Sequence, residues 1–176
     1  MVRPKRIDYP GAIHHVMNRG ARRAPIFHKD AHCILFLEVV AEAAARRGVE
    51  VHAYSLMPNH FHLLVRAVHA NVSRFMQDVG ANYSRRLNKV YSWDGPLFRG
   101  RFASELVEDD AYFMELIAYL HLNPARAHLV HRPQENCWTS HQAYLGLTAT
   151  PSWLTTELAL SLFGGSEALH RAVMER

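Results

Sequence analysis

Two histidines separated by one residue, His60 and His62, are the side chains of this sequence best placed to do chemistry. They belong to the apolar run 57–65, MPNHFHLLV, which is typical of a buried strand. Side chains alternate between the faces of a strand, so both imidazoles share one face while the apolar residues beside them enter a core. Buried imidazoles need hydrogen-bond partners or a cation. The pair could therefore bind a metal ion; two hydrogen-bonded histidines on a half-open sheet face are the alternative.

A second chemical element lies downstream, in segment 109–124. Two aspartates suit the N-cap and first turn of a helix, and Pro124 predicts its end. Within that helix Tyr119 and Asn123 are four residues apart and share a face. A phenol nucleophile and an amide oxygen could thus be presented together to a metal held by the histidine pair.

The elements needed to position these side chains follow the order strand, helix, strand, strand, helix, strand. The expected strands are 11–18, 49–57, the histidine strand and 102–107, and the expected helices are about 30–47 and 72–90. This order predicts an α+β fold, a ferredoxin-like split βαβ antiparallel sheet with both helices on one face. The histidine pair then lies on the open face, where the helix that carries Tyr119 can dock.

The length of 176 residues and the 49% hydrophobic content fit one core. We expect residues 1–132 to form the main domain, including the tyrosine helix. We expect 133–176 to form a helical appendage of the same globular unit, with short helices at 137–138 and 153–163. Apolar stretches are too short for a membrane span, and no signal-type segment follows the N-terminus, so we expect a cytoplasmic protein. The two cysteines lack the clustered spacing of a structural zinc site.

Positive charge is concentrated in two segments, although the formal net charge is only +4. Residues 1–29 hold seven basic residues and one acidic residue, or +6, and residues 66–101 hold seven and two, or +5. Such segments can be merely solvated, but beside a histidine pair they favour a polynucleotide partner. The basic side chains expected to follow a phosphate backbone are Arg3, Lys5, Arg6, Arg19, Arg22, Arg23, Arg85, Arg86, Lys89, Arg99, Arg101 and Arg126.

Three motifs in fixed order, 57–65, 95–102 and 119–127, together resemble the single-tyrosine HUH transposases. More narrowly, the chain resembles the REP-associated tyrosine transposases over about residues 9–145. The resemblance implies that His60 and His62 are metal ligands, Tyr119 the nucleophile and Asn123 the third ligand. The chain departs from the family at two positions: His128 replaces a usual glycine, and His141 replaces a common tyrosine.

The resemblance also implies an activity. It predicts a metal-dependent endonuclease and strand transferase that uses Mg²⁺ or Mn²⁺ and cuts single-stranded DNA beside a REP-like hairpin through a 5′-phosphotyrosine intermediate. It places the protein in the bacterial cytoplasm, associated with the nucleoid. The REP-associated branch favours a monomer, and a tyrosine-swapped homodimer remains open. Two other functions remain possible at this point: a non-cleaving, hairpin-specific DNA-binding regulator, and a hydrolase that activates water.

Overall fold

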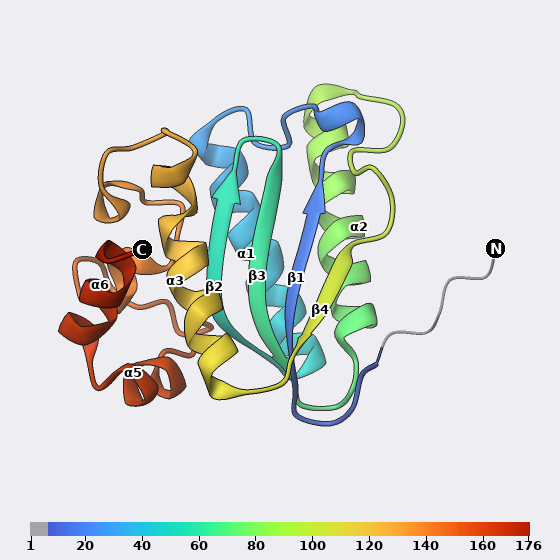
Figure 1. Ribbon diagram of the computed structural model, residues 1–176. Helices are drawn as coiled ribbons and strands as arrows, with labels where there is room; N and C mark the ends of the chain where they lie inside the picture. Colours follow the sequence, from blue (N-terminus) through green and yellow to red (C-terminus); the bar gives the residue numbers. More distant parts are fainter. Residues whose placement is uncertain (1–6) are drawn as a thin grey trace.

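An antiparallel sheet with strand order β2-β3-β1-β4 forms the centre of the protein (Figure 1). The structure is a computed structural model and describes residues 7–176, so the basic residues predicted at 3, 5 and 6 lie outside the described part. The strands are β1 (Ala12–Arg19), β2 (Val49–Met57), β3 (His60–Ala67) and β4 (Ala103–Val107). With the helices α1 (Asp30–Arg47) and α2 (Val72–Tyr91), they confirm the predicted ferredoxin-like split βαβ fold.

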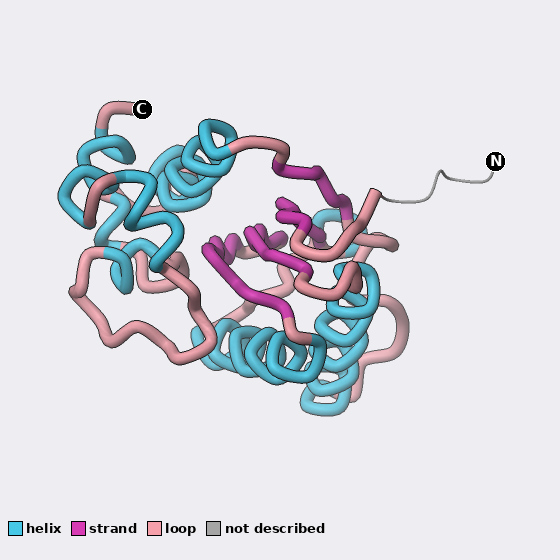
Figure 2. The backbone as a smooth tube through the Cα atoms, turned by 90° about the horizontal axis from the view of Figure 1, so that it is seen from below, coloured by secondary structure: helices cyan, strands magenta, loops and turns pink. Residues whose placement is uncertain are grey.

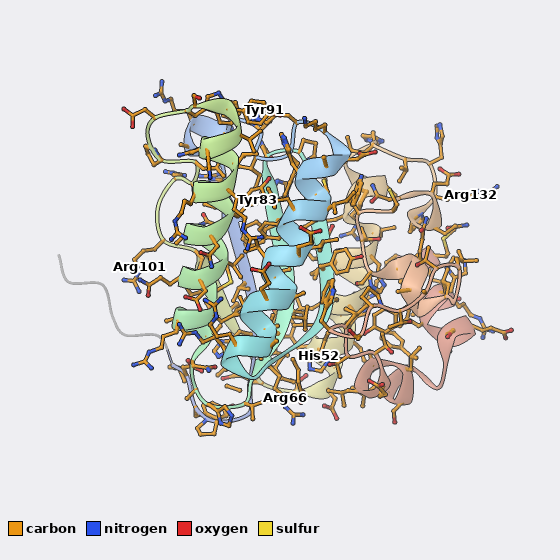
Figure 3. The ribbon with its side chains drawn as sticks, turned by 180° about the vertical axis from the view of Figure 1, so that it is seen from behind. His52, Arg66, Tyr83, Tyr91, Arg101 and Arg132 are labelled. Atoms are coloured by element: carbon orange, nitrogen blue, oxygen red, sulfur yellow. The ribbon has the colours of Figure 1, made fainter. Side chains whose placement is uncertain are left out.

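Helices α1 and α2 lie side by side over one face of the sheet (Figure 3). The buried residues of α2, including Phe75, Val79, Tyr83 and Leu87, recur every four positions and give the helix one apolar face. Helix α1 ends at Gly48, whose φ of +60° is the left-handed conformation that glycine adopts at little cost. The predicted bounds of α1 are confirmed, and α2 extends one residue beyond its prediction.

Strand β3 separates the apolar core from the sheet face that carries the histidine pair. Its residues Phe61, Leu63 and Val65 pack with α1 and α2, as predicted, and His60 and His62 therefore point to the other face. Leu64 also points to that second face and belongs to a separate apolar cluster. Both faces of the strand are thus covered near its centre.

Helix α3 (Asp110–Arg126) covers part of the face that carries the histidines (Figure 2). Leu116, Ile117 and Leu120 of this helix share a core with Leu64 of β3. Its N-cap is the predicted one, because the Asp109 side chain accepts a 2.7 Å hydrogen bond from the backbone N–H of Tyr112. The face is therefore only partly open, and the docked helix determines where Tyr119 lies.

The predicted end of this helix at Pro124 is wrong: α3 continues to Arg126. A proline in the last turn removes one backbone donor, but its carbonyl still accepts a hydrogen bond from the N–H of Leu129 at 2.9 Å. Together with the bond from His128 N–H to the Ala125 carbonyl, this contact makes a Schellman motif. His128 occupies its left-handed position with φ of +56°.

The C-terminal segment packs beside α3 and the edge strand β2. It contains η2 (Pro133–Glu135), α4 (His141–Tyr144), α5 (Glu157–Phe163) and α6 (Ser166–Met174), whereas a further short helix, η1 (Ala21–Arg23), follows β1. The helix predicted at 137–138 is absent, because this segment pairs instead with the edge of β2: Leu56 N–H donates to the Trp138 carbonyl at 2.9 Å. Helix α6 was not predicted. No helix within residues 7–176 combines the length and apolarity that a bilayer span needs.

The left-handed backbone at His128 predicts a stabilising substitution. A non-glycine residue in this conformation destabilises the folded state by about 1–2 kcal/mol. Glycine avoids that cost, but the greater chain entropy of glycine in the unfolded state offsets about 0.5–1 kcal/mol of the gain. His128→Gly should therefore raise the free energy of unfolding by about 0.5–1 kcal/mol, measured by urea denaturation. His131→Gly is the matched control, since His131 is exposed and has no positive φ. An equal change in both variants would show that the conformation at His128 has no measurable cost.

Candidate active site

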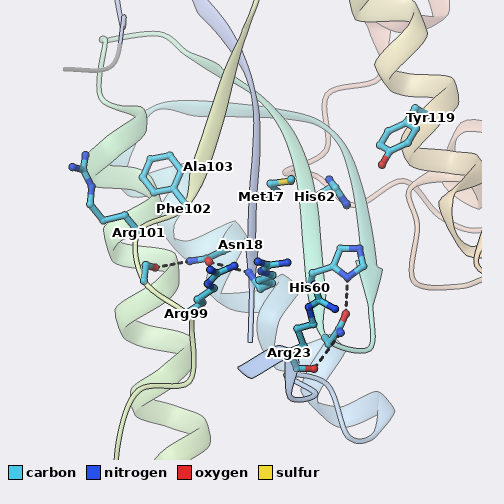
Figure 4. Close-up of a pocket in the computed structure, with 13 residues that line it drawn as sticks. Met17, Asn18, Arg23, His60, His62, Arg99, Arg101, Phe102, Ala103 and Tyr119 are labelled. Carbon is cyan, nitrogen blue, oxygen red and sulfur yellow. Dashed lines mark hydrogen bonds between the residues drawn. The ribbon is translucent and has the colours of Figure 1, made fainter. Parts of the chain in front are cut away.

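A cleft of about 860 Å³ opens between the starts of β3 and β4, the end of β1 and helix α3 (Figure 4). It gathers predicted site residues from segments far apart in the sequence. Both histidines and the tyrosine lie on its wall, together with four of the predicted arginines: His60, His62, Tyr119, Arg19, Arg23, Arg99 and Arg101. The predicted nucleophile, two of the three predicted metal ligands and four of the predicted phosphate-binding residues therefore share one concave surface.

Tyr119 faces the histidine pair across the cleft. Its ring lies edge-on to His62 with 5.8 Å between ring centroids, and Figure 4 shows its hydroxyl directed toward the sheet. The side chain is half-buried. Because α3 packs on β2 and β3 through the apolar cluster that includes Ala53 and Leu64, the phenol oxygen is presented to the pair from within the same chain.

His60 is held by its neighbour Asn59. The Asn59 amide nitrogen donates to the backbone carbonyl of Arg23 at 3.2 Å, which leaves the amide oxygen to face His60 Nδ1 at 2.7 Å. An oxygen can only accept here, so His60 donates from Nδ1 and keeps a lone pair on Nε2. Burial lowers the pKa of His60 and keeps its ring neutral.

His62 is buried against a third imidazole, that of His15. The Nδ1 atom of His62 and the Nε2 atom of His15 are 2.9 Å apart, and the two ring planes differ by 19°, with 5.1 Å between their centroids. Burial, followed by the proximity of His15 and His60, lowers the pKa of His62 to about 3. Burial also lowers the pKa of His15, against the opposing effect of the Glu105 carboxylate. The pair thus offers neutral imidazoles, the form that binds metals.

Sequence reasoning correctly placed His14 and His15 on opposite faces of β1 but missed the contact between His15 and His62. His14 contacts Asp8 at 3.2 Å on the side away from the cleft. His15 lies opposite Leu64 in the register of β1 and β3, and this places it on the face of His62. The register is a long-range property, and only a pairing of the two strands would have revealed the contact.

Asn123 lies one turn after Tyr119 on α3 and does not line the cleft. Its amide nitrogen is buried and has no hydrogen-bond partner in the structure. Exchange of the amide oxygen and nitrogen by rotation would present an oxygen there instead. Among residues 7–176, no cluster of three or more His, Cys, Asp or Glu side chains could hold a metal. Two neutral imidazoles in the cleft nevertheless fit a divalent cation that completes its coordination with water and phosphate.

The remaining predicted DNA-binding residues lie away from the cleft. Arg85, Arg86 and Lys89 belong to α2, on the opposite face of the sheet, and Arg86 forms an ion pair with Glu42 at 2.6 Å. Arg22 lines a shallow basic hollow next to the cleft, together with Arg19, Arg23 and Arg99. Arg126, at the end of α3, donates to the carbonyl of the C-terminal residue at 3.4 Å.

In this arrangement a histidine pair on an antiparallel sheet faces a tyrosine that a docked helix presents. A model of the IS200-like transposase family matches residues 9–123. The chain therefore belongs to the IS200-like transposase family, and it is a DNA transposase by that membership.

A solved structure agrees with this fold. The REP-associated tyrosine transposase bound to a REP hairpin superposes with a TM-score of 0.71 at 12% identity, covering 90% of this chain and 93% of that one. A transposase from Deinococcus radiodurans matches with a TM-score of 0.48 at 17% identity, covering 65% of this chain and 93% of that one. A comparison with curated protein sequences gives no match.

The low pKa of His62 predicts an unusual response to acid. An exposed imidazole titrates near pH 6.5, whereas His62 should stay neutral until the pH approaches about 3. The unfolded chain binds that proton more readily, so this site contributes stability that is lost as the pH falls below 6.5. In the metal-free protein, the His62 ring signals in NMR spectra should remain constant between pH 7.5 and 4.5. A titration midpoint of the His62 signals near pH 6.5 would show that the ring is not shielded from water.

Proposed function

We propose that this protein is a metal-dependent transposase that nicks and rejoins single-stranded DNA beside REP-like hairpins through a 5′-phosphotyrosine intermediate. The observation that carries the proposal is the meeting of Tyr119 with His60 and His62 in one cleft lined by arginines. Family membership supports the class of activity, and the hairpin bound to the similar structure supports the substrate. On chromosomal repeats such an enzyme would work at the bacterial nucleoid.

The chemistry begins with the phenol. A phenol in water has a pKa near 10, so a nucleophilic tyrosine needs activation at neutral pH. A divalent cation held by His60, His62 and Asn123 would supply it by withdrawing charge from the scissile phosphate. The Tyr119 oxygen then forms a bond to phosphorus and releases its proton to solvent, while the bond from phosphorus to the 3′ oxygen breaks and that oxygen takes up a proton from solvent. The products are a 5′-phosphotyrosine and a free 3′-hydroxyl.

The reverse reaction gives strand transfer. The phosphotyrosine bond has an energy similar to that of the phosphodiester it replaces, so a second 3′-hydroxyl can attack it without ATP. Rejoining rather than degradation is what transposition requires.

We propose Mg²⁺ or Mn²⁺ as the cation. Two imidazoles and an amide leave several positions for water and phosphate oxygens, which are the ligands that these hard cations prefer. Asn59 and His15 each contact Nδ1 of one ligand histidine, so the opposite ring nitrogens would meet the metal. The neutral state of both rings supports binding at physiological pH.

We propose that the DNA backbone follows the cleft and the basic hollow beside it. Arg19, Arg23 and Arg99 line both surfaces. Arg22 and Arg23 have left-handed backbone conformations, with φ of +54° and +63°. Such conformations cost free energy in non-glycine residues and are often kept where a side chain must be aimed at a ligand.

We propose that the active form is a monomer, in which residues 1–132 carry the catalytic groups and residues 133–176 hold α3 in place within the same globular unit. Tyr119 approaches the histidines of its own chain, which supports a tyrosine acting in cis. A tyrosine-swapped homodimer would require α3 to leave the apolar cluster that it shares with Leu64.

Substitution of the proposed nucleophile tests the mechanism. Tyr119→Phe should leave folding and DNA binding intact but abolish both cleavage and the covalent protein–DNA adduct, because only the nucleophilic oxygen is lost. The assay uses labelled single-stranded DNA with a REP-like hairpin, with Mn²⁺ or chelator, on a denaturing gel. Tyr9→Phe, an exposed position, is the matched control. Cleavage retained by Tyr119→Phe would eliminate the nucleophile assignment, and hairpin binding without any cleavage by the wild type would indicate a DNA-binding regulator.

The salt dependence of DNA binding tests the proposed path. Each phosphate contact on a single strand contributes about 0.7 to the slope of log K against log salt. The double variant Arg19→Ala/Arg99→Ala should therefore lower the slope by about 1.4 in fluorescence anisotropy titrations. Arg85→Ala/Arg86→Ala is the comparison, since these residues lie on the opposite face. A larger change in the second variant would place the DNA on α2.

A further inference from the structure

The hydrogen bond between His15 and His62 restricts the protons of both rings. Their nitrogens are 2.9 Å apart, and His15 is only 8% exposed, so the contact is shielded from water. A hydrogen bond between two ring nitrogens needs one N–H and one lone pair. The tautomer of His15 therefore determines which nitrogen of His62 carries its proton.

The outer nitrogen of His15 faces a carboxylate. Its Nδ1 lies 3.8 Å from a carboxylate oxygen of Glu105, which stands directly opposite His15 in the pairing of β1 with β4. An ionised carboxylate is an acceptor only, so it favours a proton on Nδ1 of His15. The inner nitrogen, Nε2, is then left with a lone pair.

The tautomer of His15 in turn determines the tautomer of His62. Since His15 accepts at Nε2, His62 must donate from Nδ1, and its own Nε2 keeps the lone pair that a metal ligand needs. The opposite arrangement would place a proton on Nε2 and block that atom. Asn59 imposes the matching tautomer on His60 from the other side, as its hydrogen bonds require.

We propose that His15 and Glu105 are positioning residues that hold His62 in the tautomer able to bind the divalent cation. The inference rests on the metal-dependent function proposed above. Carboxylates and carbonyls behind histidine ligands commonly fix their orientation, and loss of such a partner typically weakens metal binding 10- to 100-fold. Here a second histidine stands between the carboxylate and the ligand, because Glu105 lies on β4 and His62 on β3, with β1 between them.

A matched pair of substitutions at His15 separates this role from simple packing. His15→Gln keeps an amide oxygen that can accept from His62 Nδ1, whereas His15→Phe fills the space without an acceptor. We expect Mn²⁺ affinity, measured by EPR of the free ion, to fall 10- to 100-fold in His15→Phe and by less than about 3-fold in His15→Gln. Equal affinities in both variants and the wild type would overturn the proposal.

The tautomer can also be read without metal. In the metal-free wild type with ¹⁵N-labelled histidines, long-range ¹H–¹⁵N NMR correlations should place the His62 proton on Nδ1. A proton on Nε2 would overturn the proposal even if the His15 variants failed to fold. Glu105→Ala should increase the Nε2–H population of His62, while Glu108→Ala, an exposed control after the strand, should leave it unchanged. If Glu105→Ala leaves the Nε2–H population of His62 unchanged, the carboxylate does not determine the tautomer.

These results are distinct from a failure of the proposed function. If the wild type binds no Mn²⁺, or if His60→Ala leaves its affinity unchanged, the metal site itself is wrong. If the wild type binds Mn²⁺ through the histidine pair and His15→Phe binds it equally well, the metal site stands and the positioning role is wrong.

Discussion

The structure of the site depends on hydrogen-bond partners for imidazoles that lie within a sheet. Strand β3 is covered by α1 and α2 on one face and partly by α3 on the other, so its histidines are largely withdrawn from water. Each one receives a single protein partner at Nδ1: Asn59 for His60 and His15 for His62. Burial makes protonation costly, and the partners occupy only one nitrogen each. The result is a pair of neutral rings with one lone pair apiece, and an apolar environment that makes a bound cation more effective.

The second requirement is a fixed position for Tyr119, and the C-terminal segment contributes to it. Helix α3 is held by the apolar cluster that includes Leu64 and also by a chain of polar contacts behind it. His121 contacts the Ser140 hydroxyl at 2.9 Å and His141 at 3.0 Å, and the N–H of Ser140 donates to the β2 carbonyl of Tyr54. The appendage thus ties the tyrosine helix to the edge of the sheet, and a side of the domain remote from the cleft takes part in the geometry of the site.

Local signals in the sequence were sufficient for the framework but not for its long-range contacts. The end of α1 was predictable from Gly48, and β3 from its alternating apolar residues. The end of α3 was not, because the Schellman motif that terminates the helix is formed by the N–H groups of His128 and Leu129, beyond Pro124. Likewise, the short helix expected at 137–138 gave way to pairing with β2, since an exposed sheet edge supplies hydrogen bonds that local propensity does not reveal. The role of His15 followed only from the register between strands.

The central claim is that Tyr119 attacks a phosphate beside the histidine pair. Its most direct test is to digest the covalent complex formed by the wild-type protein, Mn²⁺ and hairpin-bearing single-stranded DNA, and to map the modified peptide by mass spectrometry. The account predicts a nucleotide 5′-phosphate attached to Tyr119 and no adduct when chelator is present. An adduct on another residue, or metal-dependent cleavage with no adduct at all, would contradict it.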